Sequence, residues 1–165
     1  MKRVLIALML CLVSIVGFAQ SDNDSCYNWC SCISRKVDDF TNEVKISTPF
    51  YTKPSIDKYI YPNGTIKYYL YLSLDDSYCT AGGTGLIILF KDGTKFSRPN
   101  IKVDMDYYSG DKFTYSVFIP ITQNEVKIFA QKEISKFKMY IFERNFKEID
   151  IRAFKEYANC ILELK

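Results

Sequence analysis

The fold is decided by the stretch TIKYYLYLSL, residues 65–74, in which side-chain character changes with a period of two. An apolar residue occupies every second position from Ile66 to Leu74. Successive side chains of a strand point to opposite faces, so this pattern predicts a strand with one face in a core. Asn63-Gly64 precedes the strand and predicts a hairpin that joins it to a strand at residues 57–61.

The same period of two recurs along the chain. Turn signals at Asp92-Gly93, Pro99-Asn100 and Ser109-Gly110 separate further strands, expected at residues 43–48, 86–91, 94–98, 101–107, 113–119 and 133–143. Many short strands with turns between them predict a mainly β fold, either a β-sandwich or a partly open antiparallel barrel. The predicted sheet core is Ile66, Leu70, Leu72, Leu86, Ile88, Val103, Val117, Ile119, Met139 and Ile141.

Two helices interrupt the strands. Thr122 and Glu125 have the spacing of a capping box, which opens a short helix that reaches Gln131. Asp150 is the expected N-cap of a C-terminal amphipathic helix, whose shared apolar face carries Phe154, Tyr157, Ala158 and Ile161. The glycine-rich residues 81–85 precede a strand, so they predict a flexible connection or a β-bulge and not a phosphate-binding loop.

The N-terminal residues have the pattern of a secretory signal peptide. Lys2 and Arg3 form a basic start, an apolar run follows, and Gly17 and Ala19 supply the small residues that signal peptidase requires. We expect residues 1–19 to be removed and Gln20 to begin an exported chain, periplasmic or extracellular. Residues 20–36 form a cysteine-rich leader segment, and residues 37–165 are long enough for a single β-rich domain.

Charge and hydropathy argue against two classes of partner. Removal of Lys2 and Arg3 from 22 basic residues leaves 20 against 19 acidic residues, a net charge of +1. Such a balance is no electrostatic footprint for nucleic acid, so no nucleic-acid partner is predicted. After the signal segment no apolar run approaches the length of a bilayer span, so no transmembrane segment is predicted in the mature chain.

Five cysteines follow the signal segment, and three of them are close together. Export favours disulfides, and an odd number leaves one thiol spare or paired with another chain. We predict at least one bridge from the close group to one of the two distant cysteines. Three thiolates at this spacing could alternatively bind a soft metal. The disulfide candidates are Cys26, Cys30, Cys32, Cys79 and Cys160.

The chain contains no histidine, which removes most familiar hydrolytic chemistry. Catalytic triads, zinc hydrolase sites and facial-triad iron sites all require that residue. No catalytic residue, metal site or cofactor is predicted, and we expect a non-catalytic binding or envelope-structural module. The alternative is a carboxylate-dependent glycan hydrolase, which needs two carboxylates facing each other across a cleft. Its candidate residues are Asp38, Asp39, Asp75, Asp76, Asp104 and Asp106.

Aromatic residues are concentrated around the first hairpin. On the strand at residues 65–74, Lys67, Tyr69 and Tyr71 lie opposite the aliphatic row, and Tyr59 and Tyr61 come from the hairpin partner. Tyrosines on an exposed strand face can bind a glycan or a partner protein of the envelope. The alternative is a strand buried on both faces, with these rings in a second core layer.

Three stretches resemble a group of small, uncharacterised secreted bacterial proteins. They are Asp39-Phe40-Thr41-Asn42-Glu43, Leu89-Phe90-Lys91-Asp92-Gly93-Thr94-Lys95 and Tyr157-Ala158-Asn159-Cys160-Ile161. The resemblance extends from about Val37 to Ile161 and implies a β-rich exported domain, with no activity assigned to the group. A glycine usually stands in the group where Asn42 stands here, which implies a left-handed backbone at a turn.

Overall fold

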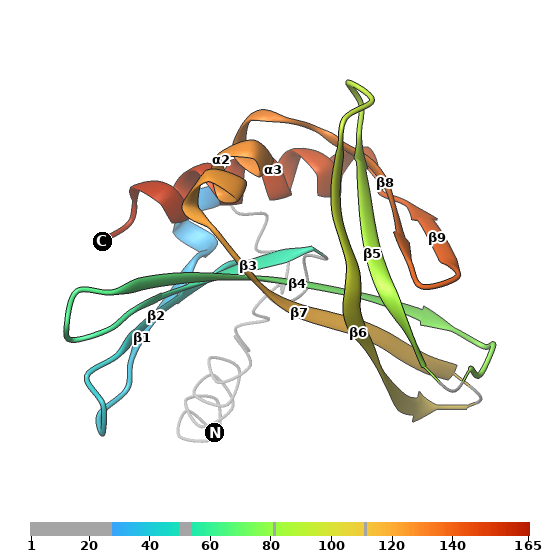
Figure 1. The fold of residues 1–165 in the computed structure, drawn as a ribbon. Coiled ribbons are helices and arrows are strands. Elements are labelled where there is room, and N and C mark those ends of the chain that lie inside the picture. Colours follow the sequence, from blue (N-terminus) through green and yellow to red (C-terminus); the bar gives the residue numbers. More distant parts are fainter. Residues whose placement is uncertain (1–27, 50–53, 81, 111) are drawn as a thin grey trace, which may run out of the picture.

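The computed structural model describes residues 28–49, 54–80, 82–110 and 112–165. The predicted signal peptide and Cys26 lie outside these residues. The described strands form one antiparallel sheet in the order β1-β2-β3-β4-β7-β6-β5-β8-β9 (Figure 1). Their bounds are β1 (Ser34–Val37), β2 (Val44–Ser47), β3 (Ser55–Ile60), β4 (Ile66–Asp76), β5 (Gly83–Phe90), β6 (Lys95–Ser109), β7 (Lys112–Ile121), β8 (Ile134–Met139) and β9 (Phe142–Asn145).

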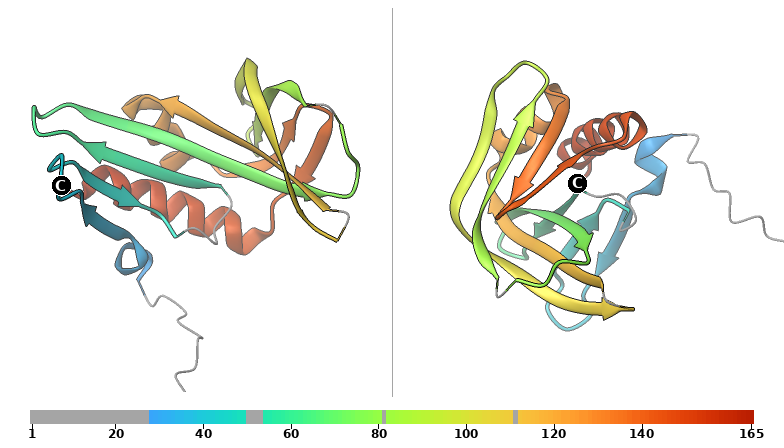
Figure 2. Two further views of the ribbon diagram at one scale, coloured as in Figure 1. Left: turned by 90° about the horizontal axis from the view of Figure 1, so that it is seen from below. Right: turned by 90° about the vertical axis from the view of Figure 1, so that its right-hand side faces the viewer.

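The sheet is strongly curved but not closed. Figure 2 shows it curling around the helices α2 (Gln123–Gln131) and α3 (Glu148–Glu163), both of which lie on its concave side. The edge strands β1 and β9 each have a single strand neighbour, so no ladder closes a barrel. The prediction of a mainly β fold with one short helix and one C-terminal helix is therefore confirmed in its partly open form.

Strand β6 joins the two parts of the sheet. Its first half pairs with β5 and its second half with β7. The predicted break at Pro99-Asn100 is wrong, because the strand continues through both residues. Pro99 lies where the β5–β6 register shifts between Thr84 and Leu86, and an irregular ladder tolerates a residue without an N–H. This shift also confirms the bulge expected in the glycine-rich residues 81–85.

The single strand predicted for residues 133–143 is two strands. A turn at Tyr140 and Ile141 separates β8 from β9, and Tyr140 has a left-handed backbone with φ of 54°. Its ring lies against Gly83, where an added Cβ atom would clash with the ring. The turn has no glycine or asparagine of its own, so the sequence carries no local sign of it.

Helix α2 begins at the predicted cap, whereas the prediction of Asp150 as the N-cap of α3 is wrong. The Thr122–Glu125 capping box of α2 is present in both directions. Helix α3 begins two residues before the predicted cap, after Lys147, and Asp150 lies in its first turn. A carboxylate there still stabilises the positive end of the helix dipole. The left-handed backbone expected at Asn42 is also found, with φ of 56°.

The core lies between the concave side of the sheet and the helices. Eight of the ten predicted core residues are buried there, packed with apolar residues of α2 and α3. The two exceptions are Ile66, 46% exposed at the first residue of β4, and Ile141, 51% exposed in the β8–β9 turn. Both have the expected alternation but lie at chain reversals, where side chains project past the packed layer.

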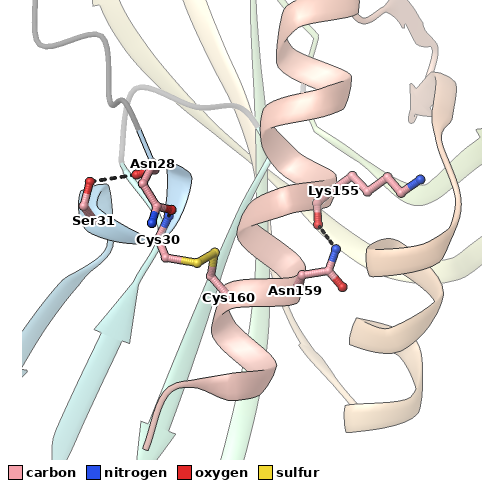
Figure 3. Close-up of a disulfide and its surroundings, with 6 residues drawn as sticks. All are labelled: Asn28, Cys30, Ser31, Lys155, Asn159 and Cys160. Atoms are coloured by element: carbon pink, nitrogen blue, oxygen red, sulfur yellow. Dashed lines mark hydrogen bonds between the residues drawn. A yellow bond between two sulfur atoms is a disulfide. The ribbon is translucent and has the colours of Figure 1, made fainter.

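A disulfide fixes the C-terminal part of α3. Cys30, in the short 3₁₀ helix η1 (Trp29–Cys32), is bonded to Cys160 across 130 residues (Figure 3). Asn28 caps η1 by accepting a hydrogen bond from the Cys30 N–H at 3.0 Å. The predicted bridge between the close cysteine group and a distant cysteine is thus found. In the chain-entropy model a loop of this length stabilises the fold by about 5 kcal/mol.

The remaining described cysteines do not support the soft-metal alternative. Cys32 is also disulfide-bonded, and a cysteine in a disulfide has no thiolate to offer a metal. Cys79 is exposed and is the free cysteine among the described residues. Cys79 follows β4, whereas the two bonded cysteines, Cys30 and Cys160, belong to η1 and α3.

A buried lysine also stabilises the end of α3. Lys58 points from β3 to the concave side, is 4% exposed, and donates to the carbonyl oxygens of Ile161 and Leu164 at 3.2 and 2.6 Å. The last carbonyls of a helix lack partners within the helix and carry partial negative charge, so an ammonium group suits them. Burial lowers the pKa of Lys58.

Candidate binding face on the convex side of the sheet

Aromatic side chains gather on the side of the sheet opposite the helices. We call this surface the convex aromatic face and define it by Lys45, Asp57, Tyr59, Tyr61, Lys67, Tyr69, Tyr71 and Phe118. Neither α2 nor α3 lies over it (Figure 2). The structure places all five sequence-predicted binding residues on this face, namely Tyr59, Tyr61, Lys67, Tyr69 and Tyr71. The aliphatic residues that alternate with them face the helices.

Three rings form a continuous row across β3, β4 and β7. Tyr59 contacts Tyr69 edge-to-face at a centroid distance of 5.4 Å, and Tyr69 stacks on Phe118 at 4.8 Å with an angle of 8° between the rings. Such contacts add roughly 0.5–1.5 kcal/mol to the burial of the rings. Phe118 is nevertheless 50% exposed. Rings ordered in this way present a preformed surface.

Phe118 was not among the predicted binding residues. It lies between Val117 and Ile119, which are both buried on the concave side. The alternation that correctly assigned those two residues to the core also places Phe118 on the opposite face. The missing information was the strand order, since only the pairing of β4 with β7 brings Phe118 beside the tyrosines.

Two lysines lie over tyrosine rings at the margins of the face. The Lys45 ammonium is 5.3 Å from the centre of the Tyr59 ring, and the Lys67 ammonium is 5.1 Å from that of Tyr61. Lys45 also forms a 2.8 Å ion pair with Asp57. Burial acts to lower the pKa of Lys45, but hydrogen bonds to Asp57 and Tyr59 outweigh it and raise that pKa. Lys45 is therefore charged at physiological pH.

A hollow of about 480 Å³ lies beside the aromatic row. Its lining combines the Lys45–Asp57 pair, the rings of Tyr71 and Phe118, and several small polar side chains from β1 to β3. The lining residues are Cys32, Ser34, Lys45, Ser47, Thr48, Pro49, Ser55, Asp57, Tyr71 and Phe118. Ligand sites typically occupy about 300–1,000 Å³, so the hollow has the size of a small-ligand subsite.

The candidate carboxylates of a hydrolase lie outside this hollow, and some of them form ion pairs. Asp104 and Asp106 line another hollow, of about 440 Å³, but they are alternate residues of one strand and so line it from one side. Asp104 is ion-paired with Lys102 and Asp76 with Arg144. A general acid needs a raised pKa, whereas the pKa is lowered at Asp38, Asp76, Asp92, Glu125, Glu133 and Glu143.

Comparison with protein-family models, curated proteins and solved structures finds no match for this chain. In the parts of the chain that the structure describes, neither helix has the length and apolar composition needed to cross a membrane.

Proposed function

We propose that this protein is exported and acts as a non-catalytic binding module whose ligand surface is the convex aromatic face. The observation that carries the proposal is the ordered row Tyr59–Tyr69–Phe118 on the sheet side away from both helices, in which Phe118 is 50% exposed and the two tyrosines are half-buried. Aromatic side chains are enriched where proteins bind partners, because rigid rings bury a large area at low entropic cost. The rings of this row point away from the core, which lies on the concave side of the sheet, so they contribute little to its packing.

Export is supported by two independent features. Residues 1–19 have the charge, apolar run and small residues of a signal peptide. The Cys30–Cys160 bond belongs to the class of links that persist in oxidising compartments and are rare in the cytosol. N-terminal sequencing of the protein recovered outside the cytoplasm should give a chain that begins at Gln20.

The binding proposal is tested by removing two rings of this row. The immobilised protein is exposed to an extract of its own cell envelope, alongside the double variant Tyr69→Ser/Phe118→Ser. We expect the wild-type protein to bind a component of the extract in a saturable manner. The double variant should not bind it. The stability of the double variant should fall by only about 1–2 kcal/mol, since no fully buried side chain is removed.

A matched control removes exposed apolar surface from another part of the sheet. Ile87 in β5 is 39% exposed and lies outside the convex aromatic face, so Ile87→Ser should retain full binding. Equal loss of binding in both variants would contradict the assignment of the ligand surface. A collapse of thermal stability in the double variant would instead make the ring row structural.

A further inference from the structure

The residues that the structure describes around the hollow beside the aromatic row carry no net charge. Among them Lys45 and Asp57 are the charged lining residues, and their side chains are 2.8 Å apart, so each neutralises the other. An ionic ligand, of either sign, therefore gains no net attraction from these described residues. A neutral ligand with both donors and acceptors can use the two groups together.

The paired charges retain capacity for more hydrogen bonds. An ammonium group has three donors and a carboxylate accepts up to about four hydrogen bonds. The Asp57 carboxylate, 2.8 Å from the Lys45 ammonium, occupies one of its donors. Hydrogen bonds to charged groups are stronger than those between neutral groups. Hydroxyl groups suit this pair, because a hydroxyl both donates and accepts.

Ring surface borders the same polar groups. Phe118 is 50% exposed although it stacks on Tyr69, and it lines the hollow together with Tyr71. The face of an aromatic ring carries partial negative charge and attracts C–H groups. A pyranose sugar has this combination of features, with C–H groups on its ring faces and hydroxyl groups around its edge.

We infer that the hollow binds one unit of a neutral glycan, with Phe118 against the sugar ring and the Lys45–Asp57 pair hydrogen-bonded to its hydroxyls. The inference rests on the proposed function, whose ligand surface it shares. A protein partner suits the hollow less well. The core of a protein interface is depleted in charged residues, whereas the Asp57 side chain is 16% exposed at the lining of this hollow.

The test is calorimetric titration of the purified protein with neutral tetrasaccharides, namely chitotetraose, cellotetraose and maltotetraose. A heparin-derived tetrasaccharide serves as the anionic comparison. We expect at least one neutral tetrasaccharide to bind, and Asp57→Asn and Phe118→Ala each to weaken it about tenfold or more. Phe40→Ala is the matched control, because Phe40 is 97% exposed in the β1–β2 turn, and it should bind as wild type does.

Three outcomes would overturn the inference. These are no binding of any neutral tetrasaccharide, binding that both variants retain, and binding of the anionic tetrasaccharide alone. The envelope-extract experiment separates this failure from failure of the proposed function. If the protein retains an envelope component through Tyr69 and Phe118 but binds no tetrasaccharide, the glycan inference is wrong and the proposed binding face stands. If the protein neither retains an envelope component through these rings nor binds a tetrasaccharide, both proposals are wrong.

Discussion

The two faces of strand β4 have the same backbone and opposite surroundings. On the concave face Leu70 and Leu72 are fully buried against α2 and α3. On the convex face Tyr69 is half-buried, and its ring contacts Tyr59 and Phe118 rather than a second layer. One strand thus contributes to stability through alternate residues and to the candidate binding surface through the others. Substitutions on the two faces should therefore differ in kind as well as in size.

The largest expected effect concerns the covalent bond that holds α3 on the concave face. Cys30→Ser removes the bond and leaves the buried Cys160 as a small apolar side chain. We expect the free energy of unfolding to fall by up to about 5 kcal/mol, because the unfolded chain regains the freedom of a 130-residue loop. Urea denaturation under non-reducing conditions measures this loss. An unchanged midpoint would show that α3 is held by packing alone.

The second prediction compares the two faces directly. Leu72→Ala should lower the free energy of unfolding by about 2–5 kcal/mol, since it leaves a cavity at a fully buried position. Tyr69→Ala, three positions earlier on the opposite face, should cost about 1 kcal/mol. Both values come from the same denaturation series. Equal losses would mean that the convex face is a second core.

A smaller loss of stability is expected from a substitution of Lys58, the buried lysine on the concave face. Lys58→Met keeps the apolar stem but leaves the carbonyl oxygens of Ile161 and Leu164 without their ammonium donor. We expect the free energy of unfolding to fall by about 1–3 kcal/mol. Hydrogen exchange should quicken first in the last turn of α3. Stabilisation by Lys58→Met would show that the cost of burying the charge exceeds the gain from its hydrogen bonds.

The coupling within the convex aromatic face should be smaller still. A double-mutant cycle with Tyr69→Ala and Phe118→Ala should give an interaction energy of about 0.5–1.5 kcal/mol, which is typical of a stacked ring pair. Tyr59 and Ile87, on different parts of the sheet, provide the reference cycle, for which we expect no coupling. A coupling of zero between Tyr69 and Phe118 would mean that the ring row is not preformed in solution.

The smallest effect is a pH dependence in the turn before β6. Hydrogen bonds from Lys132 and then Thr94 lower the pKa of Asp92 from 3.8 to about 2. The carboxylate therefore stabilises the fold fully above about pH 4, and this contribution is lost as the pH falls through about 2. Melting temperatures between pH 5 and 2 should fall less steeply for Asp92→Asn than for wild type. Parallel curves would contradict this role for the Lys132–Asp92 ion pair.

The sequence predicted those parts of the fold in which local pattern and tertiary packing agree. Alternation located the buried residues of β4 and β7, and the capping box located the start of α2. The predictions of secondary structure that proved wrong lie where a contact distant in sequence overrides the local pattern. Tyr140 adopts a left-handed turn because Gly83, far away in the sequence, leaves room for its ring. Pro99 stays within a strand because its ladder is irregular there.

The candidate site was predictable to a similar degree. Alternation placed Tyr69 and Tyr71 on the face opposite the core, and the hairpin signal placed Tyr59 beside them. Phe118 and Lys45 required the strand order, which brings β7 and β2 to either side of the hairpin. Pairing between strands distant in sequence leaves no trace in a single sequence. The hollow, whose lining comes from β1, β2, β3, β4 and β7, was therefore not predictable.

The Cys30–Cys160 bond also determines how the molecule responds to tension. Every strand from β1 to β9 lies between the two bonded cysteines. A pulling force applied before Cys30 and after Cys160 passes through the sulfur atoms and bypasses the sheet. The 130 residues between them would otherwise extend to roughly 430–470 Å, but with the bond intact their ends stay 5.4 Å apart. The protein therefore acts under load as one short, inextensible link.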